Sequence, residues 1–285
     1  MKKTFLFISL ALIALTSCEQ VIDIDLNLAD PALVINGKIV QDSLVNVCIQ
    51  ETTSYFSPDS QRCIDSAIVI ITEDNNSPDT LLNIGFGRYS SKSLKGKAGS
   101  SYNMKVILNH QEYEADSFLP IAPLIYELGT LPLLSFFGSD SGSESNFPPG
   151  GRRDSIPNML ISKLYQDPSE DDYFLMQYYL NGENISKPYD PVSDASAEND
   201  TLNIRLVSGF YLGDTIVVKA YSVDKDVFTY FDMLEDVLSG NIFSASTPYN
   251  PHSNISNGAL GVFSAMNVSS DTVIISAQIP VISDQ

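Results

Sequence analysis

Apolar and polar residues alternate along the first part of the chain. Between residues 22 and 28 the apolar side chains fall at every second position, with Asp23, Asp25 and Asn27 between them, which is the period of a half-buried strand. Turn-forming residues separate further segments of this kind, at residues 32–40, 44–50, 67–72, 80–83, 101–108 and 112–117. Short strands at this spacing, with no helical pattern among them, predict an immunoglobulin-like β-sandwich.

The second half of the chain also predicts strands until one segment changes period. Strands are expected at residues 124–134, 159–165, 173–180, 201–206, 215–222 and 272–277. An amphipathic helix is predicted where apolar residues recur at i, i+3, i+4 and i+7, namely Val227, Tyr230, Phe231, Leu234, Val237 and Leu238. Asp224 or Asp226 can cap its start, and Gly240 can close its end.

These patterns predict a mainly β protein of two domains. The stiff, proline-containing stretch at residues 119–123 is the expected boundary. Residues 18–120 would form the sandwich, and residues 121–285 a second β-rich domain with the one helix. Within the second domain, residues 136–154 are rich in Gly, Ser and Pro, which predicts a flexible loop.

The N-terminus has the pattern of an export signal. Met1-Lys2-Lys3 is basic and residues 5–15 are apolar except for Ser9, a run too short to span a membrane but suited to a signal peptide. Leu15-Thr16-Ser17-Cys18 then resembles a bacterial lipobox, in which the cysteine thiol is acylated and the peptide is cut before it. Residues 1–17 are therefore expected to be removed, leaving a lipoprotein attached to the membrane through Cys18, since two or three acyl chains anchor stably.

Charge and cysteine content narrow the function classes. The 285 residues carry a net charge of −19, and loss of Lys2 and Lys3 leaves 14 basic against 35 acidic residues, a charge of −21. Such a charge repels phosphate backbones and excludes nucleic acid as a partner. After export, Cys48 and Cys63 could form a disulfide or stay as two thiols, and the sequence leaves both open.

The remaining chemistry argues against an enzyme. No metalloprotease, phosphate-loop or dinucleotide motif is present, and Gly138-Ser139-Asp140-Ser141-Gly142 has Asp140 where a nucleophile elbow needs serine. Asp23, Asp25 and Asn27 could suggest calcium, but a straight strand spaces them too widely, so a solvated face is the better interpretation. No catalytic residue, metal site or cofactor is expected.

One polar loop is a candidate binding segment. Asn250, Asn254, Asn257 and Gly258 precede the last predicted strand, and these residue types favour turns. Their simplest role is to hold an irregular loop in one shape, and ligand or partner binding by the loop is the alternative hypothesis.

The same C-terminal segment carries a family resemblance. The chain resembles Bacteroidetes outer-membrane lipoproteins known as domain of unknown function 4249, both in the N-terminal third and after the predicted helix. The matching runs include Cys18-Glu19, residues 33–37, Gly87-Arg88-Tyr89, residues 99–102, residues 221–225, Asn250-Pro251, residues 253–255, residues 257–261 and Phe263.

The resemblance implies an N-terminal immunoglobulin-like or carboxypeptidase-regulatory-like sandwich followed by a second β-rich domain. It also implies an accessory role beside a TonB-dependent transporter, and assigns no catalytic residues. The expected function is thus a non-catalytic binding partner of an outer-membrane barrel with an unidentified ligand, the alternative being a structural or adhesive lipoprotein. Display on the cell surface is expected, with the periplasmic face left open.

Overall fold

The computed structural model describes residues 30–53, 62–132, 157–186, 188–198, 200–239 and 249–276. Several predictions fall outside these residues: the leader at residues 1–17, Cys18, the acidic strand at residues 22–28, the loop at residues 136–154 and Gly240.

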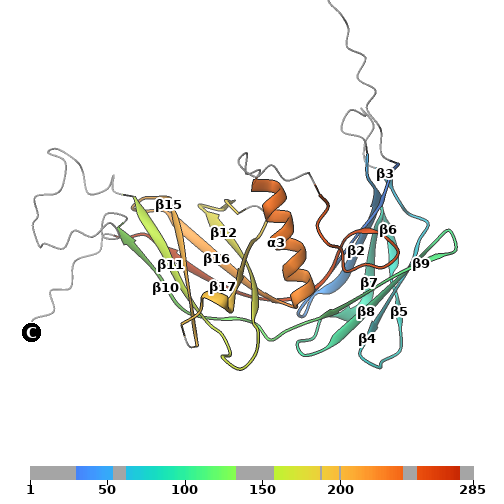
Figure 1. Ribbon diagram of the computed structural model, residues 1–285, viewed down its shortest axis with the longest axis horizontal. Coiled ribbons are helices and arrows are strands. Elements are labelled where there is room, and N and C mark those ends of the chain that lie inside the picture. Colours follow the sequence, from blue (N-terminus) through green and yellow to red (C-terminus); the bar gives the residue numbers. More distant parts are fainter. Residues whose placement is uncertain are drawn as a thin grey trace, which may run out of the picture.

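The described part is mainly β, as predicted (Figure 1). Its elements are β1 (Leu33–Val40), β2 (Leu44–Glu51), β3 (Arg62–Cys63), β4 (Ile68–Glu73), β5 (Asp79–Thr80), β6 (Leu82–Gly85), β7 (Arg88–Lys95), β8 (Ser101–Leu108), β9 (Gln111–Phe118), β10 (Leu124–Pro132), β11 (Asn158–Tyr165), β12 (Tyr173–Leu180), β13 (Glu183–Asn184), β14 (Asp190–Ser193), β15 (Thr201–Phe210), β16 (Thr215–Val223), α3 (Lys225–Ser239) and β17 (Leu260–Ile274).

One long sheet runs through both halves of the molecule. Its strand order is β13-β12-β16-β17-β1-β2-β7-β6, with β14 paired to β12 and β3 paired to β2. Two smaller sheets, β5-β4-β8-β9 and β10-β11-β15, pack against the two halves of the long sheet (Figure 1). The two predicted domains therefore share a sheet.

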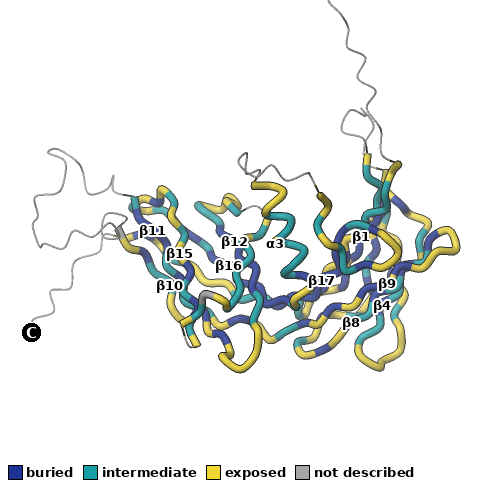
Figure 2. Tube along the Cα trace, viewed as in Figure 1, coloured by how far each residue is buried: buried dark blue, intermediate teal, exposed yellow. Residues whose placement is uncertain are grey.

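Strand β17 joins the two halves. Its first part pairs in parallel with β1, from Val34↔Leu260 to Val40↔Met266. Its second part pairs antiparallel with β16, from Ser222↔Asn267 to Thr215↔Ile274. The prediction of a last strand at residues 272–277 was wrong in its start, because every position from Gly261 to Asn267 is buried (Figure 2) and a strand covered on both faces shows no alternation.

The N-terminal half is a sandwich of two sheets. Its core combines Ile35, Val47 and Tyr89 of the long sheet with Val69 and Met104 of the β5-β4-β8-β9 sheet. Phe263 and Ala265 of β17 belong to the same core. A strand that follows β1 by more than 200 residues in the sequence therefore completes this core. The finer immunoglobulin-like assignment stays a prediction.

A second core lies on the same side of the long sheet in the other half. It packs Phe174 and Val218 of β12 and β16 against Leu160 and Ile204 of β11 and β15. Both smaller sheets thus cover one face of the long sheet. No helix among the described residues is long and apolar enough to cross a membrane.

The predicted amphipathic helix is confirmed, and it lies on the opposite face. Its Val227, with Phe228 and Phe231, packs against a third cluster that includes Tyr221 and Met266 of the sheet. Figure 1 shows α3 over the middle of the sheet, between the two halves. We call the sheet surface on this side the helix face.

Asp224 caps α3, as one of the two predicted alternatives. Its Oδ1 accepts the Val227 N–H at 2.9 Å, while its Oδ2 accepts the Ser117 hydroxyl at 2.5 Å and the Phe118 N–H at 3.0 Å. The Ser117 Oγ in turn accepts the Ala265 N–H at 2.9 Å. One carboxylate therefore ties the helix start to β9 and, through Ser117, to β17.

The acid–base behaviour of this carboxylate gives a stability prediction. Burial raises the pKa of Asp224 against the opposing effect of its three hydrogen bonds, and burial likewise raises the pKa of Asp172 and Asp190. A raised folded-state pKa makes the ionised form costly, so this cost is present at neutral pH and disappears as the pH falls towards the unfolded value of about 4. We expect the thermal midpoint to rise as the pH is lowered through the raised folded-state pKa of these carboxyls towards about 4. Asp224→Asn should show a smaller rise, and a midpoint that falls over this range would contradict the prediction.

Two short features complete the N-terminal half. The two-residue turn at Asn109-His110 joins β8 to β9 with φ of 50° and 68°, values typical of a type I′ hairpin. Strand β7 was not predicted, because its residues are mostly polar: Tyr89 is its one buried hydrophobic residue in the core, and the partly buried Leu94 packs beside it.

Candidate functional site

The helix face carries a group of polar and aromatic side chains that the sequence analysis did not single out. Lys38 comes from β1, Gln177 and Tyr179 from β12, Lys219 and Tyr221 from β16, and Tyr189 from the segment before β14. The strand pairing places all the strand residues on one face. Gln177 lies opposite Lys219 and Val268 opposite Tyr221, while Lys38 lies opposite Ser264, four residues before Val268 on the same face of β17. We call these six residues the Lys38 cluster.

Lys38 lies at one end of the cluster, against two tyrosines. Its Nζ donates a hydrogen bond to the Tyr189 hydroxyl at 3.2 Å. The same nitrogen lies 5.9 Å from the centre of the Tyr189 ring and 5.7 Å from that of Tyr221, within the range of cation–π attraction. The two rings meet edge to face with centres 5.4 Å apart, so they form a defined wall beside the ammonium group.

Gln177 connects Lys38's neighbours to the rest of the cluster. Its Oε1 accepts the Tyr221 hydroxyl at 2.9 Å and the Tyr179 hydroxyl at 3.3 Å. The Lys219 Nζ lies 4.8 Å from the centre of the Tyr179 ring. A continuous row therefore runs from Lys38 to Lys219 across the face.

Helix α3 supports the cluster from above. The Phe231 ring meets the Tyr189 ring edge to face at 4.8 Å, and Tyr230 meets Phe231 at 5.3 Å. Gln177 Nε2 also donates to the Pro188 carbonyl at 2.9 Å. These contacts fix the segment that carries Tyr189.

Electrostatics set this lysine apart from most other basic residues. Its side chain reaches solvent, yet the surrounding elements shield the ammonium group and burial lowers the pKa of Lys38. Burial also raises the pKa of Tyr189, and that of Tyr221 to about 12. Both tyrosines therefore stay protonated at neutral pH and can donate hydrogen bonds.

Neither lysine of the cluster has a carboxylate partner among the described residues. The ion pairs found there join Arg62 to Glu51, Lys105 to Glu112 and Glu114, and Lys163 to Glu127. In a chain with 35 acidic residues, Lys38 and Lys219 thus form no ion pair among the described residues. Lys38 can bind an anionic group, because it has N–H donors beyond the one given to Tyr189.

The lowered pKa can be tested directly. At a given alkaline pH a larger fraction of Lys38 is neutral and nucleophilic, so we expect Lys38 to be acylated several times faster than Lys92, an exposed lysine on β7. Brief labelling with acetic anhydride followed by peptide mass spectrometry measures both rates in one sample. Slower labelling of Lys38 at every pH would show that the cluster does not have this geometry.

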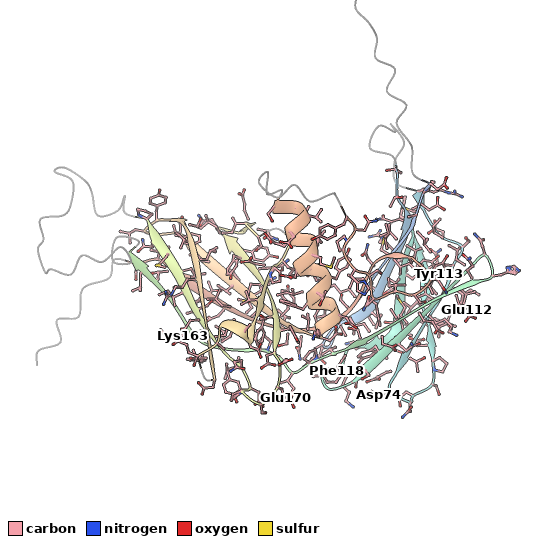
Figure 3. The ribbon with its side chains drawn as sticks, in the orientation of Figure 1. Asp74, Glu112, Tyr113, Phe118, Lys163 and Glu170 are labelled. Atoms are coloured by element: carbon pink, nitrogen blue, oxygen red, sulfur yellow. The ribbon has the colours of Figure 1, made fainter. Side chains whose placement is uncertain are left out.

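A shallow cavity of about 300 Å³ lies elsewhere, at the acidic turn between β11 and β12. Two of the carboxylates that line it bond within this region: Asp194 Oδ2 accepts the Asp172 N–H at 3.0 Å, and Asp171 Oδ2 accepts the Tyr173 hydroxyl at 3.5 Å. Glu170 marks this turn at the lower edge of Figure 3. Among the described residues no group of three or more His, Cys, Asp or Glu side chains is placed to hold a metal ion.

The candidate binding loop is bonded to the framework. The Asn254 amide donates to the Phe263 carbonyl at 2.8 Å and accepts the Phe263 N–H at 2.9 Å, which is how a neighbouring strand would bond. Asn257 Nδ2 donates to the carbonyl of Glu112 at 2.6 Å, on the strand where Figure 3 labels Glu112, Tyr113 and Phe118. This geometry supports the shape-holding role for Asn254 and Asn257. Ligand binding by the loop, with exposed Asn250 and Gly258, stays an untested hypothesis.

Cys48 and Cys63 lie on adjacent strands, β2 and β3. Gln50 is opposite Cys63, so Cys48 is its diagonal neighbour on the same face, and diagonal pairs lie near the upper limit of disulfide reach. No disulfide joins them in the structure. Burial raises the pKa of the half-buried Cys48 thiol, Cys63 adds to the effect and Arg88 opposes it. A disulfide between them after export stays a prediction.

These features define a mainly β, two-sandwich protein with a lysine–tyrosine cluster on its helix face. The chain belongs to the family described as domain of unknown function (DUF4249), whose model matches residues 19–272. No curated protein matches the chain. The match covers most of the chain, and the description of the family names no function.

Proposed function

We propose that this protein is a non-catalytic binding module of the outer membrane, anchored through lipid on Cys18 and accessory to a TonB-dependent barrel. The observation that carries the proposal is the Lys38 ammonium, which reaches solvent between two tyrosine rings and has no carboxylate partner among the described residues. The ligand chemistry that fits is an anionic group such as a carboxylate, which would pair with Lys38 and accept hydrogen bonds from tyrosine hydroxyls.

The proposed location rests on the N-terminal sequence and on the family resemblance. Leu15-Thr16-Ser17-Cys18 supplies the lipid attachment site, and the resemblance favours display on the cell surface. A module that hands a ligand to a barrel would turn its helix face towards that barrel, since the Lys38 cluster lies there.

A structural or adhesive lipoprotein is the second candidate. One observation favours it: the hydroxyls of Tyr179, Tyr189 and Tyr221 already contact Gln177, Lys38 or Met266 within the cluster. In that function the Lys38 cluster only fixes α3 and β14 on the sheet, and no ligand enters.

Purification of the tagged protein from gently solubilised outer membranes distinguishes the two. The accessory function predicts a TonB-dependent barrel in near-equal amount, found by mass spectrometry. Cys18→Ala should lose the barrel because the protein is no longer held at the membrane, whereas Lys92→Gln, an exposed β7 change, should keep it. If no barrel co-purifies with the protein, in detergent that preserves other transporter complexes, the result would support the structural or adhesive function.

A further inference from the structure

The turn between β6 and β7 presents an aromatic side chain to solvent on a strained backbone. Gly85, Phe86 and Gly87 all have positive φ, at 90°, 55° and 67°. A bulky residue such as phenylalanine rarely adopts this conformation, and local strain of this kind persists only where the surroundings enforce it. Phe86 is nevertheless 77% exposed, so the strain does not serve to bury the ring.

The surroundings hold this turn firmly. The Gly87 N–H donates to Asp65 Oδ1 at 2.7 Å, and the Gly87 carbonyl accepts the Ile49 N–H at 2.8 Å. A Cβ at Gly87 would lie 2.2 Å from the Ile49 carbonyl oxygen, so only glycine fits there. The Gly85 N–H donates to Asn83 Oδ1 at 2.6 Å. The turn is therefore a rigid support that displays Phe86.

Two more apolar side chains extend this surface along β6. Leu82 is 47% and Ile84 55% exposed, and β6 is the terminal strand in the order of the long sheet. The exposed fraction of the side chain thus increases from Leu82 through Ile84 to Phe86 at the turn. An exposed apolar edge strand is an aggregation hazard that soluble proteins usually avoid. We call Leu82, Ile84 and Phe86 the Phe86 edge.

The turn that carries Phe86 lies near the first residues of β1, where the described chain enters the sheet. Ile49 bonds to Gly87 on one side and is opposite Ile35 of β1 on the other, which puts the turn two strand spacings, about 10 Å, from β1. Residues 19–31 separate Cys18 from Ala32, a span of at most about 45 Å when fully extended. A lipid on Cys18 therefore keeps this edge within reach of the bilayer surface.

We propose that the Phe86 edge inserts into the headgroup region of the membrane that holds the lipid on Cys18. This rests on the lipid anchoring in the proposed function. Aromatic and aliphatic side chains are favoured at that depth, and the exposed Arg88 beside the turn adds attraction to anionic headgroups. With the tether and the edge as two points of contact, the module has a fixed orientation on the membrane.

The absence of tryptophan from the chain makes a sharp test available. Phe86→Trp introduces a single tryptophan at the tip, and Ile121→Trp introduces one at a site 79% exposed in the connection between β9 and β10. Each lipidated full-length variant is reconstituted in vesicles of phosphatidylethanolamine and phosphatidylglycerol. We expect a blue-shifted emission that brominated lipid quenches for Phe86→Trp, and an unshifted, unquenched emission for Ile121→Trp. Ile84→Trp serves as a second probe of the same edge.

The outcomes separate this proposal from the proposed anchoring. If intact-mass spectrometry shows no lipid on Cys18, the proposed anchoring is wrong, and the membrane insertion of the Phe86 edge that depends on it is overturned as well. If the lipidated protein is bound to vesicles while the tryptophans at positions 86 and 84 stay unquenched, the edge does not touch the bilayer and the inference is overturned. Shielding that develops only when a barrel is reconstituted with the protein would assign the edge to a protein partner, which also overturns it.

Discussion

Gly261→Ala is expected to lower the free energy of unfolding by about 4 kcal/mol, because it disturbs the pairing of β17 with β1, which joins the two halves. Gly261 has a φ of 96° and lies opposite Ile35 of β1. A Cβ there would lie 2.1 Å from the Ile35 carbonyl oxygen. Since that atom belongs to the backbone, β17 must move away from β1 and the shared sheet is disturbed at its centre. Urea unfolding followed by circular dichroism measures the loss.

Gly258→Ala is the matched control. Gly258 also has a positive φ, 74°, but a Cβ there meets nothing within 4 Å. Its replacement should cost only the left-handed backbone strain, about 1 to 2 kcal/mol. Equal losses in the two variants would show that the close approach of β17 to β1 is not what requires glycine at position 261.

Asp224→Ala is expected to cost about 3 kcal/mol, the second large effect. The loss combines the helix cap, about 1 kcal/mol, with the unpaired Ser117 hydroxyl and Phe118 N–H, about 1 to 3 kcal/mol. Both donors lie at the end of β9, so the damage reaches the N-terminal sandwich as well as α3. Asp224→Asn should cost less, since an amide oxygen can still cap the helix.

Asp226→Ala is the control for charge at the helix start. Asp226 lies in the first turn of α3 and is exposed, so its loss should change the free energy of unfolding by less than about 1 kcal/mol through the helix dipole. The same circular dichroism experiment measures all three variants. If Asp226→Ala were as damaging as Asp224→Ala, the negative charge rather than the hydrogen bonds would stabilise the helix start.

Local patterns predicted most elements but not how they assemble. Alternation located β1, β2, β4, β8, β9, β12 and β16 to within a few residues, and the 3.6-residue period located α3. Strand β17 was largely missed because both its faces are buried between Gly261 and Asn267. Its parallel pairing with β1 joins segments more than 200 residues apart, and no local pattern reports such a pairing.

The Lys38 cluster was missed for the same reason. Lys38 and Tyr189 are 151 residues apart in sequence, and each reads locally as an ordinary surface residue. The asparagine-rich loop was found because its residue types have a local meaning. The contacts of Asn254 and Asn257 with β17 and β9 then gave that loop a framework role. Clusters assembled across a sheet are visible only once the register is known.

Three features lie on one sheet. The Phe86 edge lies on its terminal strand β6, the Lys38 cluster occupies the helix face, and β17 makes the two halves one framework. A rigid framework suits a module that presents a ligand in a fixed direction. The whole chain has a net charge of −19, so an anionic ligand would depend on direct contacts with Lys38 and its neighbours rather than on long-range attraction.

Hydrogen exchange of the purified protein, alone and in complex with the proposed barrel partner, tests the central claim that the helix face is the binding surface. The account predicts slower exchange in the complex for residues 188–193 and for α3, which frame the Lys38 cluster, and unchanged exchange in β10 and β15 at the edges of the smaller sheet. Protection confined to β10 and β15, with residues 188–193 and α3 unchanged, would contradict it.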